Sequence, residues 1–193
     1  MVAVARPRPS QVSRLAGILP DVPGSSIRLV PFDDSHLPGM QAMVDDPDVL
    51  RFTRVPDPPP PGFARTWFDA YEAGRAIGTR EAFAVLGPDG DFLGIAVAPR
   101  IDREGRTLEL GYVIAPHARG RGVATEALRL LTEWAFGTFG AKRLELLISV
   151  DNDASKRVAA KVGYVYEGTM RQMHFKQDIW EDGEIWSRIP TDA

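Results

Sequence analysis

Two arginines and two glycines stand immediately before a stretch that has the apolar spacing of a helix. They are Arg119, Gly120, Arg121 and Gly122, and the predicted helix continues to about residue 140. Glycine allows backbone turns that other residues resist, and the first N–H groups of a helix have no partner within it. Together with the helix dipole and two guanidinium groups, such a turn suits a pyrophosphate. The stretch is a candidate anion cradle, and an ordinary turn between a strand and a helix is the alternative.

Two common phosphate-binding motifs do not fit this stretch. A P-loop ends in Gly-Lys-Ser/Thr, whereas this one continues as Gly122, Val123, Ala124 and Thr125. The dinucleotide fingerprint needs a third glycine, and Thr125 occupies that position. The anion cradle therefore belongs to neither of these nucleotide-binding classes.

The composition restricts the class of protein. The chain has 193 residues, which one domain can hold, and its formal net charge of -3 offers no basic field to nucleic acid or a membrane surface. There is no cysteine, and the three histidines are far apart, so we expect neither disulfides nor a metal site. In residues 1–24, Pro20 interrupts an apolar piece too short for a signal peptide or membrane span. We expect a flexible or loosely packed arm at 1–24, a single domain over 25–193 and a cytoplasmic protein.

The spacing of apolar and turn residues predicts an α/β domain with a mixed sheet. Four consecutive prolines put residues 55–62, including the Pro56–Pro61 segment, in an extended loop. Residues 176–182 are expected to link the last two strands as a loop. Strands are predicted at residues 26–32, 107–116, 142–151, 164–175 and 183–189 and as a hairpin at 81–101; helices are predicted from 33 to Pro47, at 63–76, at 123–140 and from Asn152.

The anion cradle and two flanking segments resemble the GNAT superfamily of N-acetyltransferases. Residues 119–124 match the family motif Q/R-x-x-G-x-G/A, "LELGYVIAPHA" precedes them, and "NDASKRVAAKVGYVYEG" resembles the family segment N-x-x-S/A…K-x-G-F…E-G. The likeness runs from about Ser26 to Ile189 and is strongest to the branch with the ribosomal-protein N-terminal acetyltransferases. It implies a mostly antiparallel sheet of about seven strands, with flanking helices and a splayed acyl-CoA cleft.

The resemblance also assigns a co-substrate and the residues that would hold it. Acetyl-CoA is implied, with no metal. The pyrophosphate would rest on the backbone from Arg119 to Ala124, with Thr125 adding a hydroxyl, and a Val113 or Ile114 N–H would support the developing oxyanion. The implied cofactor-binding residues are Tyr112, Val113, Ile114, Arg119, Gly120, Arg121, Gly122, Val123, Ala124, Thr125, Asn152 and Ser155.

Direct attack of an amine on a thioester needs a base, because only the neutral amine is nucleophilic. Glu109 alternates with Leu108 and Leu110 along its strand, so its side chain leaves the face that they bury; the alternative is a solvent-facing carboxylate without a role. His174 in the last hairpin is the second candidate, although a lone histidine is more often a surface or packing residue. Where many family members have a general-acid tyrosine this chain has Ala159, which leaves Ser155 or water to serve the sulfur.

Aromatic residues gather in the segments expected to wall the acceptor groove. For Trp67 and Tyr71 the favoured interpretation is helix core, and the acids from Asp178 to Asp182 are also consistent with a solvated loop. Aromatic walls with carboxylates suit a cationic amine or a peptide N-terminus. The candidate acceptor-binding residues are Phe52, Trp67, Tyr71 and Trp180.

Three functions remain open from the sequence. The first is acetylation of a protein or peptide N-terminus, and the second is acetylation of a small amine such as an antibiotic or polyamine. A wide acidic pocket would favour a polyamine, and a slot for an extended backbone would favour a peptide. The third is a non-catalytic acyl-CoA-binding regulatory module, against which Glu109 argues. A homodimer is possible, because dimers are common in the family that the chain resembles.

Overall fold

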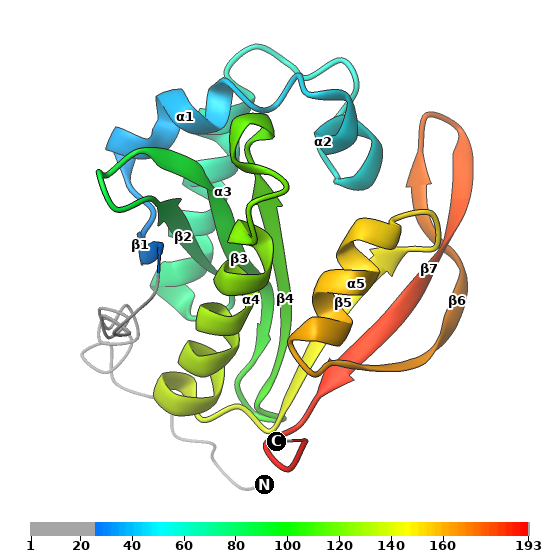
Figure 1. Cartoon of the computed structure of the whole chain (residues 1–193). Coiled ribbons are helices and arrows are strands. Elements are labelled where there is room, and N and C mark those ends of the chain that lie inside the picture. Colours follow the sequence, from blue (N-terminus) through cyan, green and yellow to red (C-terminus); the bar gives the residue numbers. More distant parts are fainter. Residues whose placement is uncertain (1–25, 193) are drawn as a thin grey trace, which may run out of the picture.

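The structure, a computed structural model, describes residues 26–192. Its seven strands form one sheet in the order β1-β2-β3-β4-β5-β7-β6 (Figure 1), and every neighbouring pair is antiparallel except β4 and β5. This sheet confirms the predicted mixed, mostly antiparallel architecture, whereas the arm predicted at residues 1–24 lies outside the described residues. The strands are β1 (Arg28–Pro31), β2 (Glu81–Leu86), β3 (Phe92–Asp102), β4 (Thr107–Ile114), β5 (Arg143–Ser149), β6 (Val165–Lys176) and β7 (Ile179–Arg188).

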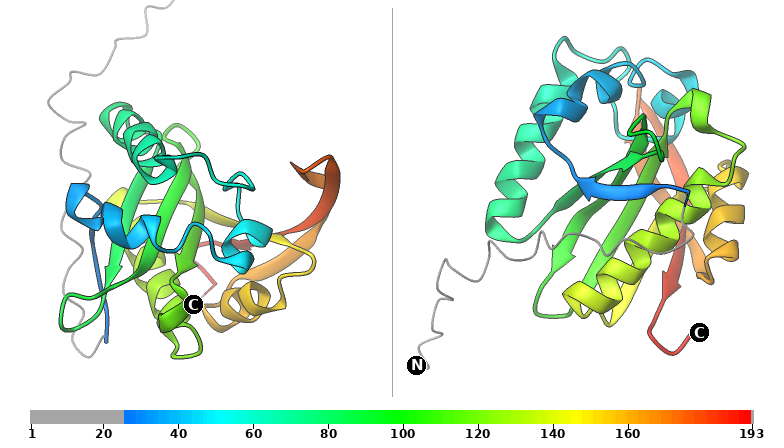
Figure 2. Two further views of the ribbon diagram at one scale, coloured as in Figure 1. Left: turned by 90° about the horizontal axis from the view of Figure 1, so that it is seen from above. Right: turned by 60° about the vertical axis from the view of Figure 1, so that its left-hand side comes forward.

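Helices cover both faces of the sheet (Figure 2), with α1 and α3 on one face and α4 and α5 on the other. Within residues 26–192, none of them has the length and apolar character needed to cross a membrane. The helices are α1 (Leu37–Gln41), α2 (Pro47–Phe52), α3 (Phe63–Ile77), α4 (Val123–Trp134) and α5 (Asp153–Lys161), with short helical turns η2 (Asp34–His36), η3 (Pro116–Ala118) and η4 (Ala135–Phe139).

Each face of the sheet has its own apolar layer, and the residues of β4 alternate between the two. Leu108 and Leu110 are almost fully buried, in the layer that also contains Leu128 and Trp134 of α4. Glu109 lies between these leucines in the sequence, so its side chain leaves the opposite face of the strand.

Strands β4 and β5 pair only along a short segment and then diverge (Figure 1). The paired residues are Thr107 with Arg143, Leu108 with Leu144 and Glu109 with Glu145. A bulge in β3, between Val97 and Arg100, lies on the other side of β4 at the point where the separation begins. From residue 111 to residue 114, β4 therefore pairs with β3 on one edge and, within residues 26–192, has no strand on the other.

One helix boundary was predicted wrongly. Pro47 was expected to end the first helix, but it begins α2 as a separate helix. The side chain of Asp46 caps α2 by accepting a hydrogen bond from the Val49 N–H, and proline is well tolerated in the first helical turn. A second helix therefore stands above the diverging strands.

The prediction of a loop at residues 176–182 is also wrong. Gln177 and Asp178 have φ values of 50° and 60°, and they alone connect β6 to β7 as a tight turn. Trp180 consequently lies in a strand, paired with Phe175, instead of in a hairpin loop. The long hairpin carries β6 as far as α2.

Candidate active site

A cleft of about 950 Å³ opens where β4 and β5 separate. Its walls come from β4, β5, α2, α3, β6 and the first turn of α5. The candidate residues that do not line it are Gly120, Arg121, Gly122, Val123, Thr125 and Trp180. The candidate residues that it brings together are Phe52, Trp67, Tyr71, Glu109, Tyr112, Val113, Ile114, Arg119, Ala124, Asn152, Ser155 and His174.

The turn before α4 borders open space, and two of its positions have backbone angles that favour glycine. Gly120 and Gly122 have φ values of 73° and 83°, which other residues adopt only with strain. A Cβ atom at either position would meet nothing within 4 Å, so the turn borders open space. Gly122 is the N-cap of α4 and supplies no side-chain cap, which leaves backbone donors at this helix start for an anion.

The two arginines of this turn differ in their surroundings. Arg119 donates from Nη2 to Asp46 at 2.6 Å, from Nη1 to Asp48 at 3.0 Å and from Nε to the Ile114 carbonyl oxygen at 3.1 Å. Arg121 is exposed, and within residues 26–192 it has no ion pair. Arg119 therefore joins the turn to α2, whereas the charge of Arg121 is available to a ligand.

The start of α5 forms the wall of the cleft opposite β4. Oδ1 of Asn152 accepts a hydrogen bond from the Ser155 N–H at 3.0 Å and so caps the helix. The side chain of Tyr112 packs between β4 and this helix start, close to Ser155. Burial raises the pKa of Tyr112 to about 12, and the neighbouring Ser155 hydroxyl offsets part of that rise.

Glu109 lies at the point where the strands part. Its side chain is 14% exposed, and its Oε2 is 3.5 Å from Nε of Arg100. Glu145 of β5, its register partner, is equally enclosed and accepts from Arg100 at 3.0 Å. Of these two carboxylates, only Glu109 lines the cleft. The structure thus encloses Glu109 and leaves it facing the cleft.

His174 of β6 faces the same cleft, opposite Glu181 of β7. Burial lowers the pKa of His174, the positive charge of Arg54 lowers it further, and Glu181 and Glu109 partly oppose both effects. The negative charge of Glu109 is therefore close enough to His174 to affect its pKa. The imidazole is consequently biased towards its neutral form.

Aromatic side chains from α2 and α3 form the apolar wall of the cleft. Tyr71 is 6% exposed and its ring centroid is 4.2 Å from that of Trp67, so both serve the core and the cleft wall. Phe52 closes the same wall from α2. Trp180 lies outside, 55% exposed and 4.8 Å from the Phe175 ring.

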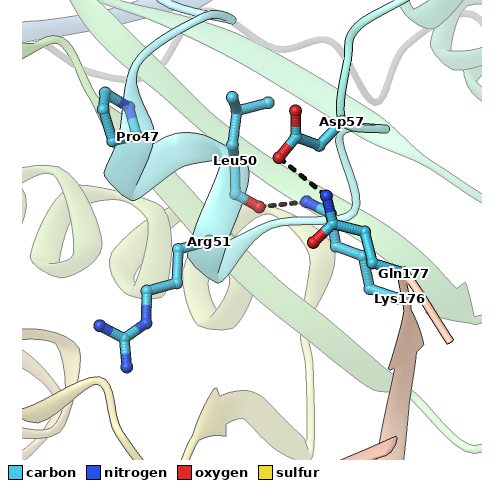
Figure 3. Close-up of a pocket in the computed structure, with 6 residues that line it drawn as sticks. All are labelled: Pro47, Leu50, Arg51, Asp57, Lys176 and Gln177. Atoms are coloured by element: carbon cyan, nitrogen blue, oxygen red, sulfur yellow. Dashed lines mark hydrogen bonds between the residues drawn. The ribbon is translucent and has the colours of Figure 1, made fainter. Parts of the chain in front are cut away.

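The end of the β6–β7 hairpin is fastened to α2 and to the proline-rich loop (Figure 3). Lys176 donates from Nζ to the carbonyl oxygens of Leu50 and Thr53, and Gln177 donates to Asp57 at 2.9 Å. These bonds border a smaller pocket of about 300 Å³. They form a bridge across one end of the cleft.

Some residues of this site were not found from the sequence. Arg54 was not considered, because no periodic pattern marks an isolated charge at a helix end. Tyr112 was given a cofactor-binding role without attention to its hydroxyl, although alternation along β4 places its side chain on the same face as Leu110. The pairing of His174 with Glu181 would have followed from recognising Gln177 and Asp178 as a two-residue turn.

Residues 26–165 match the acetyltransferase (GNAT) domain family, and the chain belongs to this family. The ribosomal-protein-serine acetyltransferase of Escherichia coli (strain K12) is 28% identical over 112 residues, which are 58% of this chain and 62% of that protein. The match therefore spans less than two thirds of this relative. The predicted family and its likeness to the ribosomal-protein branch are both confirmed.

Solved structures show the same fold at low sequence identity. RimL, the ribosomal L7/L12 alpha-N-protein acetyltransferase in complex with coenzyme A, has a TM-score of 0.82 at 19% identity, covering 91% of this chain and 99% of that chain. Spermidine N-acetyltransferase from Vibrio cholerae, in complex with CoA and spermine, has a TM-score of 0.77 at 16% identity, covering 88% and 98%. The fold is thus shared by proteins named for two different acceptor classes.

Proposed function

We propose that this protein is an acetyl-CoA-dependent N-acetyltransferase that acts on the N-terminal amine of a protein or peptide. The observation that carries the proposal is the cleft between β4 and β5, which extends from the enclosed Glu109 carboxylate to the turn at the start of α4. When bound, acetyl-CoA supplies a thioester carbonyl that an amine can attack. The protein has to hold the phosphates, accept a proton and select the amine.

The open turn before α4 fits the phosphate end of the co-substrate. Gly120 and Gly122 keep the approach to the helix start free of side chains, and Arg121 adds a positive charge that has no ion pair within residues 26–192. Arg119 instead holds the turn and α2 in place through Asp46 and Asp48. Backbone donors with a flexible cation bind a pyrophosphate without requiring a further side chain.

Glu109 is positioned to accept the proton of the amine. Its side chain is enclosed and faces the cleft. Backbone N–H groups of Val113 or Ile114 are the candidate donors to the carbonyl oxygen, because this part of β4 has no strand on its cleft edge. His174 is the alternative proton acceptor.

The charges around the acceptor end favour a peptide N-terminus over a polyamine. Arg51, Arg54 and Lys176 line this side of the cleft, against the carboxylates Glu109 and Glu181 and against Asp151, which lies 3.2 Å from Arg51. A polyamine carries several positive charges and needs an excess of carboxylates nearby. A single amine attached to a neutral or acidic chain suits this mixed lining better.

The aromatic wall supports a small cationic amine as a second candidate. Trp67 and Phe52 offer ring faces on which a cation can lie. A panel that compares N-terminal peptides with spermidine, measured as thiol release from acetyl-CoA, tests both candidates. Turnover of peptides alone supports the first, and faster turnover of spermidine contradicts it.

Arg54→Glu sharpens this test, because it reverses the charge balance without touching Glu109. We expect the variant to lose activity towards peptides and to gain activity towards spermidine. Arg171→Glu at an exposed position of β6 is a matched control, because it makes the same charge reversal outside the cleft. Binding of acetyl-CoA without turnover on any acceptor would instead support the regulatory module.

The homodimer that the family resemblance implies would use the last two strands. β6 is an edge strand, and exposed apolar side chains lie along it and β7. Sedimentation equilibrium of the full chain tests this proposal, with a monomer at all concentrations as the contrary result. The exposed apolar residues there are Val165, Tyr166, Phe175, Ile179 and Trp180.

A further inference from the structure

Gly94 of β3 lies where the neighbouring strand approaches too closely for a side chain. It pairs with Ile114 of β4, and a Cβ atom at this position would lie 2.2 Å from the Val113 carbonyl oxygen and 3.0 Å from the Ile114 Cα. At the other crowded glycines of the described chain, the nearest atom belongs to a side chain, which can move. With a φ value of 150°, Gly94 also has a backbone conformation that other residues rarely adopt. Both observations restrict this position to glycine.

The backbone that approaches Gly94 belongs to the part of β4 that borders the cleft. Val113 and Ile114 both line the cleft, whereas Gly94 does not. Within residues 26–192, the segment from residue 111 to residue 114 pairs with β3 alone, so β3 is the strand that sets its position. A side chain at Gly94 would therefore push this segment towards the cleft, because no strand lies on that edge to resist it.

Backbone groups of β4 point alternately to its two edges, and this alternation identifies the donor that faces the cleft. The Ala115 N–H donates to the Leu93 carbonyl oxygen at 2.8 Å, so Ala115 and Val113, two residues earlier, direct their backbone groups towards β3. Ile114 directs its groups towards the open edge, where its carbonyl oxygen accepts from Nε of Arg119 at 3.1 Å. The N–H of Ile114 therefore faces the cleft.

We propose that Gly94 is a positioning residue, which holds the Ile114 N–H where it meets the thioester carbonyl oxygen of bound acetyl-CoA. This inference rests on the proposed function. Because Gly94 does not line the cleft, it acts through the carbonyl group of Val113. The missing side chain lets β3 and β4 approach each other, and this approach keeps the open edge of β4 aligned with the carbonyl oxygen and the pantetheine arm of CoA.

The test compares Gly94→Ala with Gly168→Ala in β6. Gly168 has a similar φ value, 158°, but an added Cβ atom there would meet nothing within 4 Å. Calorimetry measures the affinity for CoA and for phosphoadenosine diphosphate, the nucleotide half of CoA, which has no pantetheine. We expect Gly94→Ala to weaken CoA about fivefold and to lower kcat roughly 100-fold, while the nucleotide half stays within about twofold. Gly168→Ala should leave all three quantities within about twofold.

A vibrational measurement separates misplacement of the Ile114 N–H from a general loss of stability. The infrared frequency of an isotope-labelled thioester carbonyl should be lower in bound than in free acetyl-CoA, because a hydrogen bond from a fixed donor polarises the C=O bond. The measurement is made without an acceptor, so the thioester stays intact. Gly94→Ala should return the frequency towards the free value, and Gly168→Ala should not.

If Gly94→Ala does not fold, replacement of Ile114 by its α-hydroxy acid, which removes the N–H and keeps the side chain, takes its place. It should abolish the frequency shift, and a retained shift would overturn the inference. An unshifted carbonyl in the unaltered protein, or equal loss of CoA and of the nucleotide half in Gly94→Ala, would overturn it as well. Failure of the unaltered protein to bind acetyl-CoA would instead refute the proposed function, and it is seen before any variant is made.

Discussion

Nη2 of Arg119 lies 2.6 Å from Oδ1 of Asp46, and this ion pair joins the turn before α4 to the first residue before α2. Burial alone would raise the pKa of Asp46, but hydrogen bonds from Arg119 and from backbone N–H groups lower it overall. The same carboxylate caps α2. The segment beside the end of the cleft that we propose for the acceptor is thus fixed to the segment proposed to hold the phosphates.

Substitution of the two arginines of the turn should consequently affect different properties, CoA affinity for Arg121 and stability for Arg119. Arg121→Ala should weaken CoA about two- to fivefold, and less at high salt, because its charge is exposed. Arg119→Ala should lower the free energy of unfolding by about 1–2 kcal/mol, because it leaves Asp46 and Asp48 without their cation. Calorimetry at two salt concentrations and urea unfolding separate the two effects. Equal losses of CoA affinity would contradict this division.

Glu109 and Glu145 provide a matched pair for testing the base. Both side chains are 14% exposed and both contact Arg100, but only Glu109 lines the cleft. Glu109→Gln should slow turnover roughly 100- to 10,000-fold, the range for loss of a general base, with acetyl-CoA affinity retained. Glu145→Gln should stay within a few-fold of the unaltered protein. A small effect of Glu109→Gln would transfer the role to His174.

His174 should make the protein sensitive to mild acid. Its pKa is lowered in the folded state, so the unfolded state binds the proton first as the pH falls through about 6.5. The free energy of unfolding should therefore decrease as the pH falls from about 6.5 towards the lower folded pKa, and become constant with respect to this group below it. His174→Gln should remove this part of the pH dependence, as measured by urea unfolding at a series of pH values. An unchanged pH profile would show that burial of His174 does not affect its titration.

Tyr112→Phe and Tyr164→Phe should differ in their effects on stability. Tyr112→Phe removes a buried hydroxyl that lies beside Ser155 and has no well-formed hydrogen bond within residues 26–192, so the ligand-free protein should be as stable or up to about 1 kcal/mol more stable. Tyr164→Phe breaks the bond to Thr132 and should cost about 1–2 kcal/mol. Chemical denaturation without ligand measures both. A loss of stability in Tyr112→Phe would mean that its hydroxyl already has a partner, for instance a bound water.

Much of the fold was predictable because its signals are local. Glycines at the turn before α4, alternation of Leu108, Glu109 and Leu110, and apolar spacing in α3 each depend on neighbouring residues. The errors arose where one residue admits two structures. Pro47 can end a helix or begin one, and the Asp46 cap that decides between them was overlooked.

The site was only partly predictable, because its geometry joins residues that are distant in the sequence. Alternation along β4 placed Glu109 on the correct face, but its approach to Arg100 depends on strand register. Arg119 carries the charge that a phosphate needs, yet its partner Asp46 lies 73 residues earlier in the chain. No local pattern indicates that a long-range carboxylate already occupies that guanidinium group.

The short pairing of β4 with β5 divides the sheet into two parts, β1 to β4 and β5 to β7, which are joined by few backbone hydrogen bonds. Three residue pairs, from Thr107–Arg143 to Glu109–Glu145, connect the two parts through the backbone, and beyond them the strands separate. A ligand that forms hydrogen bonds with the unpaired edges of both β4 and β5 would fix the distance between the two parts of the sheet. The free energy of binding would then include the cost of restricting their relative motion. Substitutions in the three pairs that join the two parts could therefore change the affinity without contacting the ligand.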